Sequence, residues 1–537
     1  MHQLFLEQND AYPWTNENHV YFKGYVFDQT ERFLEGDSAL KLFRGAGLPE
    51  LKTILSGSEG VFSLIIRSDQ GMILGSDPMG FFPVFYGKTE KGWWVSDKPS
   101  GFPAATPERT PNTDAFDEFL SAGHVLGNET LLKGVYRVRP GELVRLNNDH
   151  SLDAFPLFEF LPSAPSGDNQ SELKDQLLGI LDRASRRLVR SLNGKTAVVP
   201  LSGGYDSRLI ACMLKKAGYE KVVCFTYGRR THETDLSERV AGILGYPWVF
   251  VNYESLEAAG FLTDPVFLSY CDYAGNLTSM PFLQEYFGVK HLQENQLIPG
   301  ESIFLPGHPG DNLGGSFIAR GVKGNHRPEQ LSSLISRVFF HFIPLNRTRK
   351  NMIGQRISAW LDQKPEWKDL KVEGYSPQIE GWNFSERLPK FIFNSARVFP
   401  FFQYGIRFPL WSRELAVFFS QVPYGLRENK YLYNKALEEG YFKPLNLFFK
   451  EEEVRPHRSI RLPFWIKSLG WKWLPAPLLQ KKAVQNDWIC YDRFTKEMRN
   501  EMIREGTKPL TRYRSLNALI CQWYLSRRIN YGKKLFN

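Results

Sequence analysis

Residues 199–207 read Val-Pro-Leu-Ser-Gly-Gly-Tyr-Asp-Ser, and this stretch lies where an apolar run gives way to a helical pattern. The apolar run, residues 195–201, has the length of a buried strand, whereas residues 207–217 have the apolar spacing of a helix. Gly203 and Gly204 allow a tight turn and a close approach of the backbone. The N–H groups of the turn and of the first helical turn would then face an anion, and the helix dipole would add to the attraction.

Three side chains of this loop indicate that the anion is a phosphate held with a metal ion. The hydroxyls of Ser202 and Ser207 add hydrogen-bond donors. Asp206 would repel a bare anion, but it fits the loop if Mg²⁺ lies between the carboxylate and the phosphates. The loop is neither a Walker A sequence nor a dinucleotide-binding GxGxxG. The alternative, an ordinary glycine turn, does not account for the aspartate and the second serine.

The elements around the loop alternate between helix and strand. Helices are expected at residues 172–192, 207–217 and 235–244, and strands at residues 195–201, 221–227 and 248–253. Short connections between such elements are typical of a parallel, doubly wound α/β sheet. Residues 330–537 have mostly helical patterns, which predicts a helical C-terminal extension of the sheet.

The first part of the chain has a different pattern. Short strands separated by Gly and Pro are expected at residues 20–27, 60–67, 72–76, 83–86 and 92–95, with a helix at residues 113–121. Residues 161–171, LPSAPSGDNQS, are rich in Pro, Gly and small polar residues and predict a linker. We therefore expect an α+β domain over residues 1–160, a linker over residues 161–171 and an α/β domain over residues 172–537.

Composition excludes several classes of protein. With 537 residues, 42% hydrophobic and 23% charged, the chain can bury a core and is not disordered, collagen-like or coiled-coil. A net charge of +9 over this length does not by itself imply a nucleic-acid partner. The five cysteines form no CxxC pair, which favours reduced thiols and a cytoplasmic location. No apolar run has the length of a spanning helix, and the start lacks the pattern of a signal peptide.

Ser-Gly-Gly-Tyr-Asp-Ser after a strand resembles the pyrophosphate-binding loop of the ATP pyrophosphatases, and its surroundings resemble the asparagine synthetase-like family. Further stretches share this resemblance: residues 225–228 (FTYG), 307–311 (GHPGD), 407–411 (RFPLW), 430–432 (KYL) and, upstream, 80–86 and 138–142. The resemblance implies an Ntn-hydrolase-like α+β domain followed by a parallel α/β synthetase domain of the adenine nucleotide α-hydrolase-like type. The variants are most similar to those of members from polysaccharide and O-antigen gene clusters.

The resemblance also implies a site for ATP and Mg²⁺. The residues expected to bind the nucleotide are Leu201, Ser202, Gly203, Gly204, Asp206, Ser207, Phe225, Thr226, Tyr227, Gly228, Gly307, His308 and Gly310. Asp206 and Asp311 are the expected magnesium ligands and are counted among the catalytic residues. Lys430 is a further catalytic candidate, and His457 or Arg458 could replace the late-chain lysine that the family uses beside the adenylate.

The chain departs from the glutamine-using members of the family. Position 2 is His2 in place of the nucleophilic cysteine, and no cysteine precedes position 212. Lys23-Gly24-Tyr25 stands where those members have Asn-Gly-Glu. Without a thiolate the covalent glutamyl step cannot occur, so we expect no glutaminase activity, with nitrogen taken from ammonia or a separate glutaminase. His308 and Asn312 replace residues that are usually acidic, which argues against aspartate as the substrate.

The expected function is therefore an AMP-forming carbon–nitrogen ligase. The expected substrate is a small-molecule carboxylate, a nucleotide- or lipid-linked sugar uronate of surface polysaccharide biosynthesis. Two alternatives stay open: an intramolecular cyclase of the β-lactam synthetase or lasso-peptide type, and an ATP-binding pseudoenzyme that serves as a scaffold. We expect no nucleic-acid partner and no membrane contact, and a homodimer is left open. The aromatic residues of 391–419 are expected to form packed core, not a sugar-stacking platform.

Overall fold

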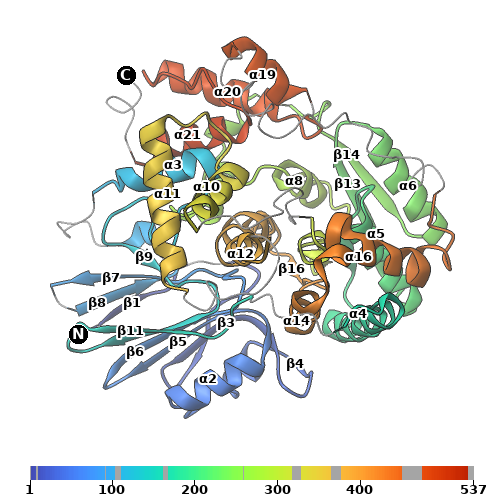
Figure 1. The fold of residues 1–537 in the computed structure, drawn as a ribbon, viewed down its shortest axis with the longest axis horizontal. Helices are drawn as coiled ribbons and strands as arrows, with labels where there is room; N and C mark the ends of the chain where they lie inside the picture. The colour runs from blue at the N-terminus through green and yellow to red at the C-terminus, as the bar shows by residue number, and fades with distance from the viewer. Residues whose placement is uncertain are drawn as a thin grey trace.

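The structure is a computed structural model that describes residues 2–7, 10–90, 92–102, 110–160, 167–257, 259–316, 328–364, 376–449, 475–485 and 487–529. Figure 1 shows two parts with different sheets, blue antiparallel strands near the N-terminus and a green sheet flanked by helices. Helices of the later chain lie between these two parts and around them.

Two sheets form the N-terminal part. One has seven strands in the order β11-β10-β6-β5-β3-β2, with β4 pairing with β3, and all its pairs are antiparallel. Its strands are β2 (Thr15–Glu17), β3 (Val20–Phe27), β4 (Phe33–Glu35), β5 (Glu59–Ser68), β6 (Gly71–Ser76), β10 (Glu142–Asn147) and β11 (Leu152–Pro156). The other sheet has the order β1-β8-β7-β9 and consists of β1 (Gln3–Phe5), β7 (Phe85–Thr89), β8 (Gly92–Ser96) and β9 (Tyr136–Arg137).

The N-terminal part is layered. Helices α1 (Asp37–Leu40) and α2 (Leu48–Gly57) cover one face of the seven-stranded sheet, where Leu51 of α2 belongs to the same buried cluster as Phe62 of β5. Ile65, on β5, shares a second cluster with Trp93 of the four-stranded sheet. Strand residues alternate between these two faces, as the period of two requires. The expected α+β first half is therefore present.

The second sheet type follows after α4 (Gln170–Leu192). Five parallel strands lie in the order β14-β13-β12-β15-β16, with the bounds Trp248–Asn252, Val222–Gly228, Ala197–Pro200, Ile303–Phe304 and Gly405–Ile406. Helices α5 (Tyr205–Lys216) and α6 (His232–Leu244) connect the first three strands along the chain. Because β12 lies between β13 and β15, the loops after these three strands meet at one edge of the sheet.

Helices make up most of the remaining described chain. They are α3 (Thr113–Ala122), α7 (Pro265–Gly275), α8 (Tyr286–Glu294), α9 (Gly310–Gly314), α10 (Pro328–Phe339), α11 (Arg347–Asp362), α12 (Ser376–Trp382), the π-helix η4 (Asn383–Phe393), α13 (Val398–Phe401), α14 (Arg413–Gln421), α15 (Tyr424–Arg427), η5 (Glu428–Lys430), α16 (Tyr431–Leu437), the π-helix η6 (Glu438–Phe442), α19 (Ala476–Val484), α20 (Tyr491–Arg504) and α21 (Asn517–Arg528), with short 3₁₀ turns at η1 (Pro99–Gly101) and η2 (Phe261–Thr263). Among helices of the described residues, none is long and apolar enough to cross a bilayer.

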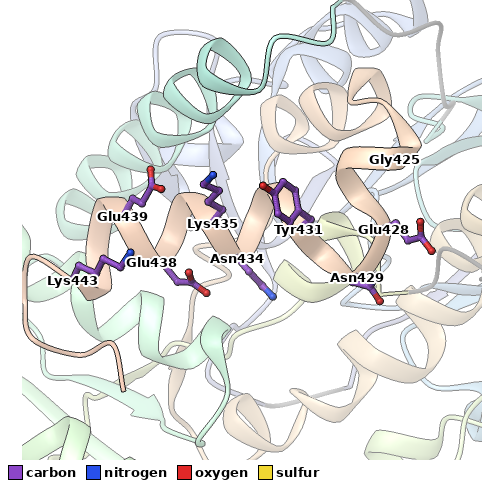
Figure 2. Close-up of a pocket in the computed structure, with 9 residues that line it drawn as sticks. All are labelled: Gly425, Glu428, Asn429, Tyr431, Asn434, Lys435, Glu438, Glu439 and Lys443. Atoms are coloured by element: carbon purple, nitrogen blue, oxygen red, sulfur yellow. The ribbon is translucent and has the colours of Figure 1, made fainter. Parts of the chain in front are cut away.

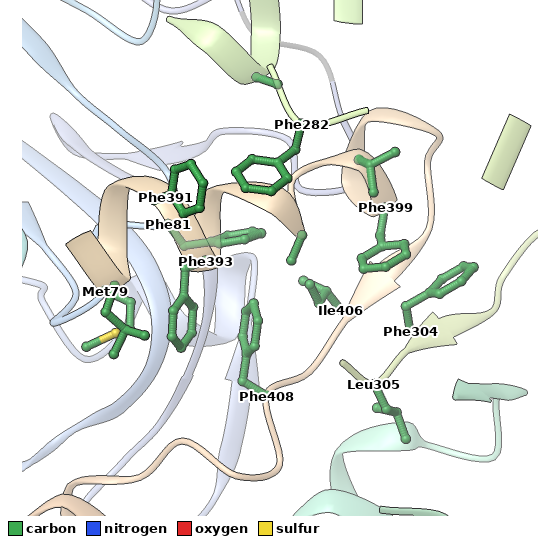
Figure 3. Close-up of a cluster of buried hydrophobic side chains, with 14 of the residues drawn as sticks. Met79, Phe81, Phe282, Phe304, Leu305, Phe391, Phe393, Phe399, Ile406 and Phe408 are labelled. Carbon is green, nitrogen blue, oxygen red and sulfur yellow. The ribbon is translucent and has the colours of Figure 1, made fainter. Parts of the chain in front are cut away.

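Aromatic side chains join the two parts into one core. The ring of Phe81, from the N-terminal part, lies 5.3 Å from that of Phe408, and Phe408 lies 4.5 Å from Phe393 (Figure 3). The rings of Phe282 and Phe391 make an edge contact at 4.6 Å. All five are buried. The interpretation of the late aromatic residues as packed core is confirmed.

One predicted boundary is wrong by two residues. Helix α4 begins at Gln170, inside the stretch expected to be linker, because the side chain of Asn169 accepts hydrogen bonds from the N–H groups of Ser171 and Glu172. Such a cap satisfies donors that the first turn of a helix leaves free. Residues 161–166 lie outside the described part of the chain, so the rest of the linker stays a prediction.

Candidate functional site

The loop that the sequence predicts to bind phosphate, residues 202–207, is called the phosphate loop below. It joins the end of β12 to the first turn of α5, as expected. The hydroxyl of Ser207 accepts a hydrogen bond from the backbone N–H of Ser202 at 3.0 Å, and the hydroxyl of Ser202 accepts one from the N–H of Gly204 at 3.2 Å. These bonds fold the loop over the first turn of α5. Ser202 and Gly204 are exposed, so the loop is open to a ligand at the positive end of the helix dipole.

Gly203 allows a close approach between this loop and helix α6. A Cβ atom at Gly203 would lie 3.1 Å from the Cα of Glu233, which is tighter than almost all real contacts. Leu201, at the start of the loop, donates its N–H to the carbonyl of Phe225 at 2.8 Å. The loop is therefore held by the next strand and by the next helix.

The second predicted loop lies directly against the first. Residues 307–310 follow β15, and the His308–Pro309 peptide bond is cis. A Cβ at Gly307 would lie 3.0 Å from the Cβ of Asp206, and one at Gly310 would lie 2.9 Å from Asp206 Oδ1. Both glycines are required where they stand, because a side chain would push the two loops apart.

Asp206 and Asp311 are brought together by this contact. The backbone N–H of Asp311 donates to Asp206 Oδ2 at 2.9 Å, and the hydroxyl of Tyr433 donates to Asp206 Oδ1 at 2.7 Å. Burial, and next the charge of Asp311, raise the pKa of Asp206 to about 7, against the opposing effects of Tyr433 and Lys430. A divalent cation bound between the two carboxylates would relieve the repulsion that Asp311 exerts on Asp206.

The donor set fits Mg²⁺ that is shared with phosphates. Mg²⁺ prefers hard oxygen ligands, and it is usually bound by one or two carboxylates together with substrate phosphates and water. Among the residues that the structure describes, no group of three or more His, Cys, Asp or Glu side chains could hold a metal alone. Asp206 and Asp311 would therefore supply two ligands, and the nucleotide would supply others.

Asn312 and Asn383 connect Asp311 to the helical extension. The Nδ2 of Asn312 donates to Asp311 Oδ1 at 2.8 Å, and the Nδ2 of Asn383, on η4, donates to the Oδ1 of Asn312 at 3.3 Å. Asn383 is 1% exposed. Asn312 thus orients the carboxylate beside it, which a residue with a second negative charge could not do in the same way.

Thr226 and Tyr227, in the stretch 225–228, make hydrogen bonds to other residues of the chain. The hydroxyl of Thr226 donates to the carbonyl of Leu201 at 2.8 Å, and the hydroxyl of Tyr227 donates to Glu285 at 2.9 Å. A Cβ at Gly228, where φ is +107°, would lie 2.7 Å from the carbonyl oxygen of Trp488. These residues lie at the correct edge of the sheet, and their contact with adenosine stays a prediction.

The catalytic candidates late in the chain have different outcomes. Lys430 has left-handed backbone angles just before α16, and its charge lowers the pKa of Asp206. Three residues further on, Tyr433 makes the direct contact that sequence reasoning missed. Its position on the helix that begins after Lys430 was the available signal. His457 and Arg458 lie outside the described residues.

A pocket of about 550 Å³ borders this helix (Figure 2). Its lining includes Asn434 and Glu438, and the carboxylate of Glu438 accepts a hydrogen bond from the hydroxyl of Tyr205 at 2.9 Å. Tyr205 is the residue before Asp206 in the phosphate loop. The pocket therefore lies beside the helix that carries Tyr433, and none of residues 202–207 is among its lining residues.

The N-terminal part has a buried ion pair at Lys23, in the Lys-Gly-Tyr stretch of residues 23–25. The Nζ of Lys23 lies 3.0 Å from Asp10 Oδ1, with the two side chains 1% and 0% exposed, and the hydroxyl of Tyr273 donates to the other oxygen of Asp10 at 2.7 Å. His2 accepts a hydrogen bond from the N–H of Trp93. All five cysteines are free and buried, and all lie beyond this part.

No family model matches the chain. The microcin J25-processing protein McjC of Escherichia coli is 26% identical over 170 residues, a match that covers 31% of this chain and 30% of that protein. This match agrees with the resemblance of the phosphate loop to the asparagine synthetase-like family. The chain spans under a third of the curated relative that it matches, so the activity of that relative is not transferred to it.

Solved structures give a weaker comparison. A glutamine phosphoribosylpyrophosphate amidotransferase from B. subtilis, complexed with ADP and GMP, is 14% identical, with 45% of this chain and 72% of that chain covered and a TM-score of 0.19. An NH₃-dependent NAD synthetase from Campylobacter jejuni subsp. jejuni is 13% identical, with 42% and 96% covered and a TM-score of 0.22. Scores this low do not establish a common fold.

Proposed function

We propose that this chain is an ATP-dependent amide-forming enzyme that adenylates a carboxylate and transfers a nitrogen to it. The observation that carries the proposal is the pair Asp206 and Asp311, held together beside an open phosphate loop at the ends of neighbouring parallel strands. The relationship to the asparagine synthetase-like proteins supports the same chemistry.

In the first step, a carboxylate oxygen of the substrate attacks the α-phosphorus of ATP. The bond from that phosphorus to the bridging oxygen breaks, and pyrophosphate leaves with the electron pair. Negative charge then grows on the leaving group, so donors must already point at it. The N–H groups at the start of α5 and the hydroxyl of Ser202 are placed for this task.

Asp206 and Asp311 would hold magnesium at the same edge. When bound, the ion would neutralise charge on the phosphates and orient them. Tyr433 keeps the carboxylate of Asp206 in place through its hydrogen bond, and Asn312 does the same for Asp311. These side chains thus preorganise the site before the nucleotide arrives.

In the second step, an amine nitrogen attacks the acyl carbon, the bond from that carbon to the AMP oxygen breaks, and the nitrogen loses a proton. We propose that the nitrogen comes from ammonia, an amine or a separate glutaminase. The absence of a cysteine before position 212 and the burial of Lys23 in an ion pair with Asp10 support a nitrogen source other than glutamine bound in the N-terminal part.

Two classes of carboxylate are candidates. A sugar uronate of surface polysaccharide synthesis is favoured by the resemblance of residues 225–228 and 307–311 to those of family members from polysaccharide gene clusters. A carboxylate within a peptide, joined by an intramolecular cyclase, is favoured by the match to a protein whose name gives it a role in processing microcin J25. A scaffold without activity would retain the loop but release no pyrophosphate.

The test is pyrophosphate release by the full chain with ATP, Mg²⁺, ammonium and each candidate carboxylate. We expect release with one class of carboxylate, and a fall of roughly 100-fold or more in the variant D206N, because charge development would no longer be balanced. D235N is the matched control, since Asp235 is a carboxylate on α6 that pairs with Arg230 and is 58% exposed. Equal release by D206N and D235N would refute the assignment of the loop.

A further inference from the structure

A second pocket, of about 330 Å³, adjoins the second phosphate-site loop. His308 forms part of its lining, and the neighbouring residue Gly307 contacts Asp206. A molecule bound in this pocket would therefore lie next to the group that is activated at the phosphate loop. The Phe282 and Phe391 rings of Figure 3 form part of its wall.

The charge of this pocket is opposite to that of the chain as a whole. Among the residues that the structure describes, its lining includes the carboxyl groups of Glu285 and Asp487 and no lysine or arginine, although the chain carries a net charge of +9. Burial lowers the pKa of His308, against the opposing charge of Asp311, and so disfavours a positive charge on its imidazole. The pocket is thus unsuited to phosphates or to a second carboxylate, and suited to a cation.

Glu285 is the group that most needs a partner. It is 7% exposed; its Oε1 accepts the hydroxyl of Tyr227 at 2.9 Å, and its Oε2 has no hydrogen-bond partner. No ion pair of Glu285 is found among the described residues. The phenols of Tyr227, Tyr253, Tyr270 and Tyr491 lie within electrostatic reach of Glu285. A buried carboxylate without a cation is unfavourable unless a ligand supplies one.

The walls of the pocket are aromatic. The rings of Phe282 and Phe391 meet at 4.6 Å, and the ring of Trp488 stacks on Tyr227 at 5.8 Å. Aromatic faces attract an ammonium ion and also bury an apolar group attached to it. Ammonia alone has about the size of a water molecule and would leave most of this volume unfilled.

We infer that this pocket binds the nitrogen donor of the reaction as a primary ammonium ion carried on an apolar or aromatic body. The inference rests on the proposed amide-forming function and specifies its second substrate. Glu285 would pair with the ammonium group, and the aromatic walls would cover the body. The amine would then face the acyl group activated beside His308.

The test measures binding to the full chain by calorimetry, without ATP. The probes are phenethylamine, ammonium chloride, 2-phenylethanol as the neutral counterpart, and phenylalaninamide as a mimic of a peptide N-terminus. We expect phenethylamine or phenylalaninamide to bind roughly tenfold or more tightly than either ammonium or the alcohol. The stronger of these two amines identifies the source as a free amine or a peptide.

Three variants decide the role of the pocket. E285Q should weaken amine binding roughly tenfold or more and leave 2-phenylethanol unchanged, because only the charge is lost. W488A, at a residue that is 43% exposed, should weaken the binding of phenethylamine more than the binding of ammonium. E294Q, at the exposed C-terminal end of helix α8, whose N-cap is Glu285, is the control and should bind as the wild type does. Amine binding that is unchanged in both E285Q and W488A would overturn the inference.

The proposed function is tested by a different measurement, the binding of MgATP. MgATP binding by the wild type and its loss in D206N test the phosphate loop, whereas amine binding should persist in D206N. A chain that binds MgATP but shows no preference for the amines would refute the amine pocket alone. A chain that binds the amines but not MgATP would refute the proposed function.

Discussion

The backbone N–H of Asp311 donates a hydrogen bond to the carboxylate of Asp206 at 2.9 Å, although the two residues are 105 positions apart in the chain. They meet because β12 and β15 are neighbours in the parallel sheet, with Val198 opposite Phe304. Each aspartate follows its strand after a glycine-containing turn. The contact places two negative charges at the mouth of the phosphate loop.

Replacing Asp311 with asparagine should weaken the use of magnesium. The variant D311N would retain the backbone hydrogen bond to Asp206, but its neutral side-chain amide would not balance a divalent ion. We expect kcat/KM for pyrophosphate release to fall roughly 100-fold and the required Mg²⁺ concentration to rise. A magnesium titration of D311N against the wild type measures this, and superimposable titration curves would contradict the role of Asp311.

The variant G310A should disrupt the site through sterics alone. The added Cβ would lie 2.6 Å from the hydroxyl of Tyr433 and 2.9 Å from Asp206 Oδ1, so the two loops must separate. We expect MgATP binding to be lost and the melting temperature to fall. G242A, in the exposed interior of α6 with no atom within 4 Å of the new Cβ, should leave binding intact and stabilise the chain by up to about 1 kcal/mol. Equal behaviour of the two variants would show that the loops tolerate the displacement.

The ion pair of Lys23 with Asp10 should be important for stability. K23M would leave the carboxylate of Asp10 buried without its cation, which costs roughly 3–5 kcal/mol. K98M is the matched control, because the pair of Lys98 with Glu7 at 3.4 Å is exposed and is worth about 0–1 kcal/mol. The midpoint of urea unfolding measures both. A similar small shift for both variants would mean that Asp10 finds other partners.

Stability should depend on pH through Glu285. Burial raises the pKa of this carboxyl from its ordinary value of 4.5 to about 7. Because the folded pKa is the higher one, the folded chain binds the proton more tightly; the resulting stability is complete below about pH 4.5 and is lost as the pH rises towards 7. The wild type should therefore lose stability relative to E285Q by roughly 1 kcal/mol per pH unit in this window. Urea unfolding of both at about pH 5 and 7 tests this, and a constant difference would contradict it.

The elements near the site were predictable because their signals are local. The apolar run before Ser202, the paired glycines and the helical spacing after Asp206 specify a strand, a turn and a helix within a few residues of one another. β3 was predicted at its observed bounds, Val20–Phe27, for the same reason. The start of α4 was missed by two residues because the side chain of Asn169 acts as its cap.

The contacts of the site were less predictable. Tyr433 is 227 positions from Asp206, and Glu285 is 58 positions from Tyr227, so no spacing along the chain indicates either hydrogen bond. Asn312 appeared as a departure from the family's acidic residue, and its role in orienting Asp311 follows from its distance to that carboxylate. The resemblance to a family identified the two loops of the site but not the residues that make hydrogen bonds to their side chains.

The amino-acid sequence determined the parallel α/β type of the second half, the α+β type of the first and the strand-turn-helix structure around residues 202–207. Hydrophobic periodicity and glycine turns act over a few neighbouring residues, so the sequence alone reveals them. Only the tertiary structure decided which loops face each other, which carboxylates share a site and which pocket lacks a cation. Those properties depend on the order of strands in the sheet and on burial, which arise when distant segments pack together.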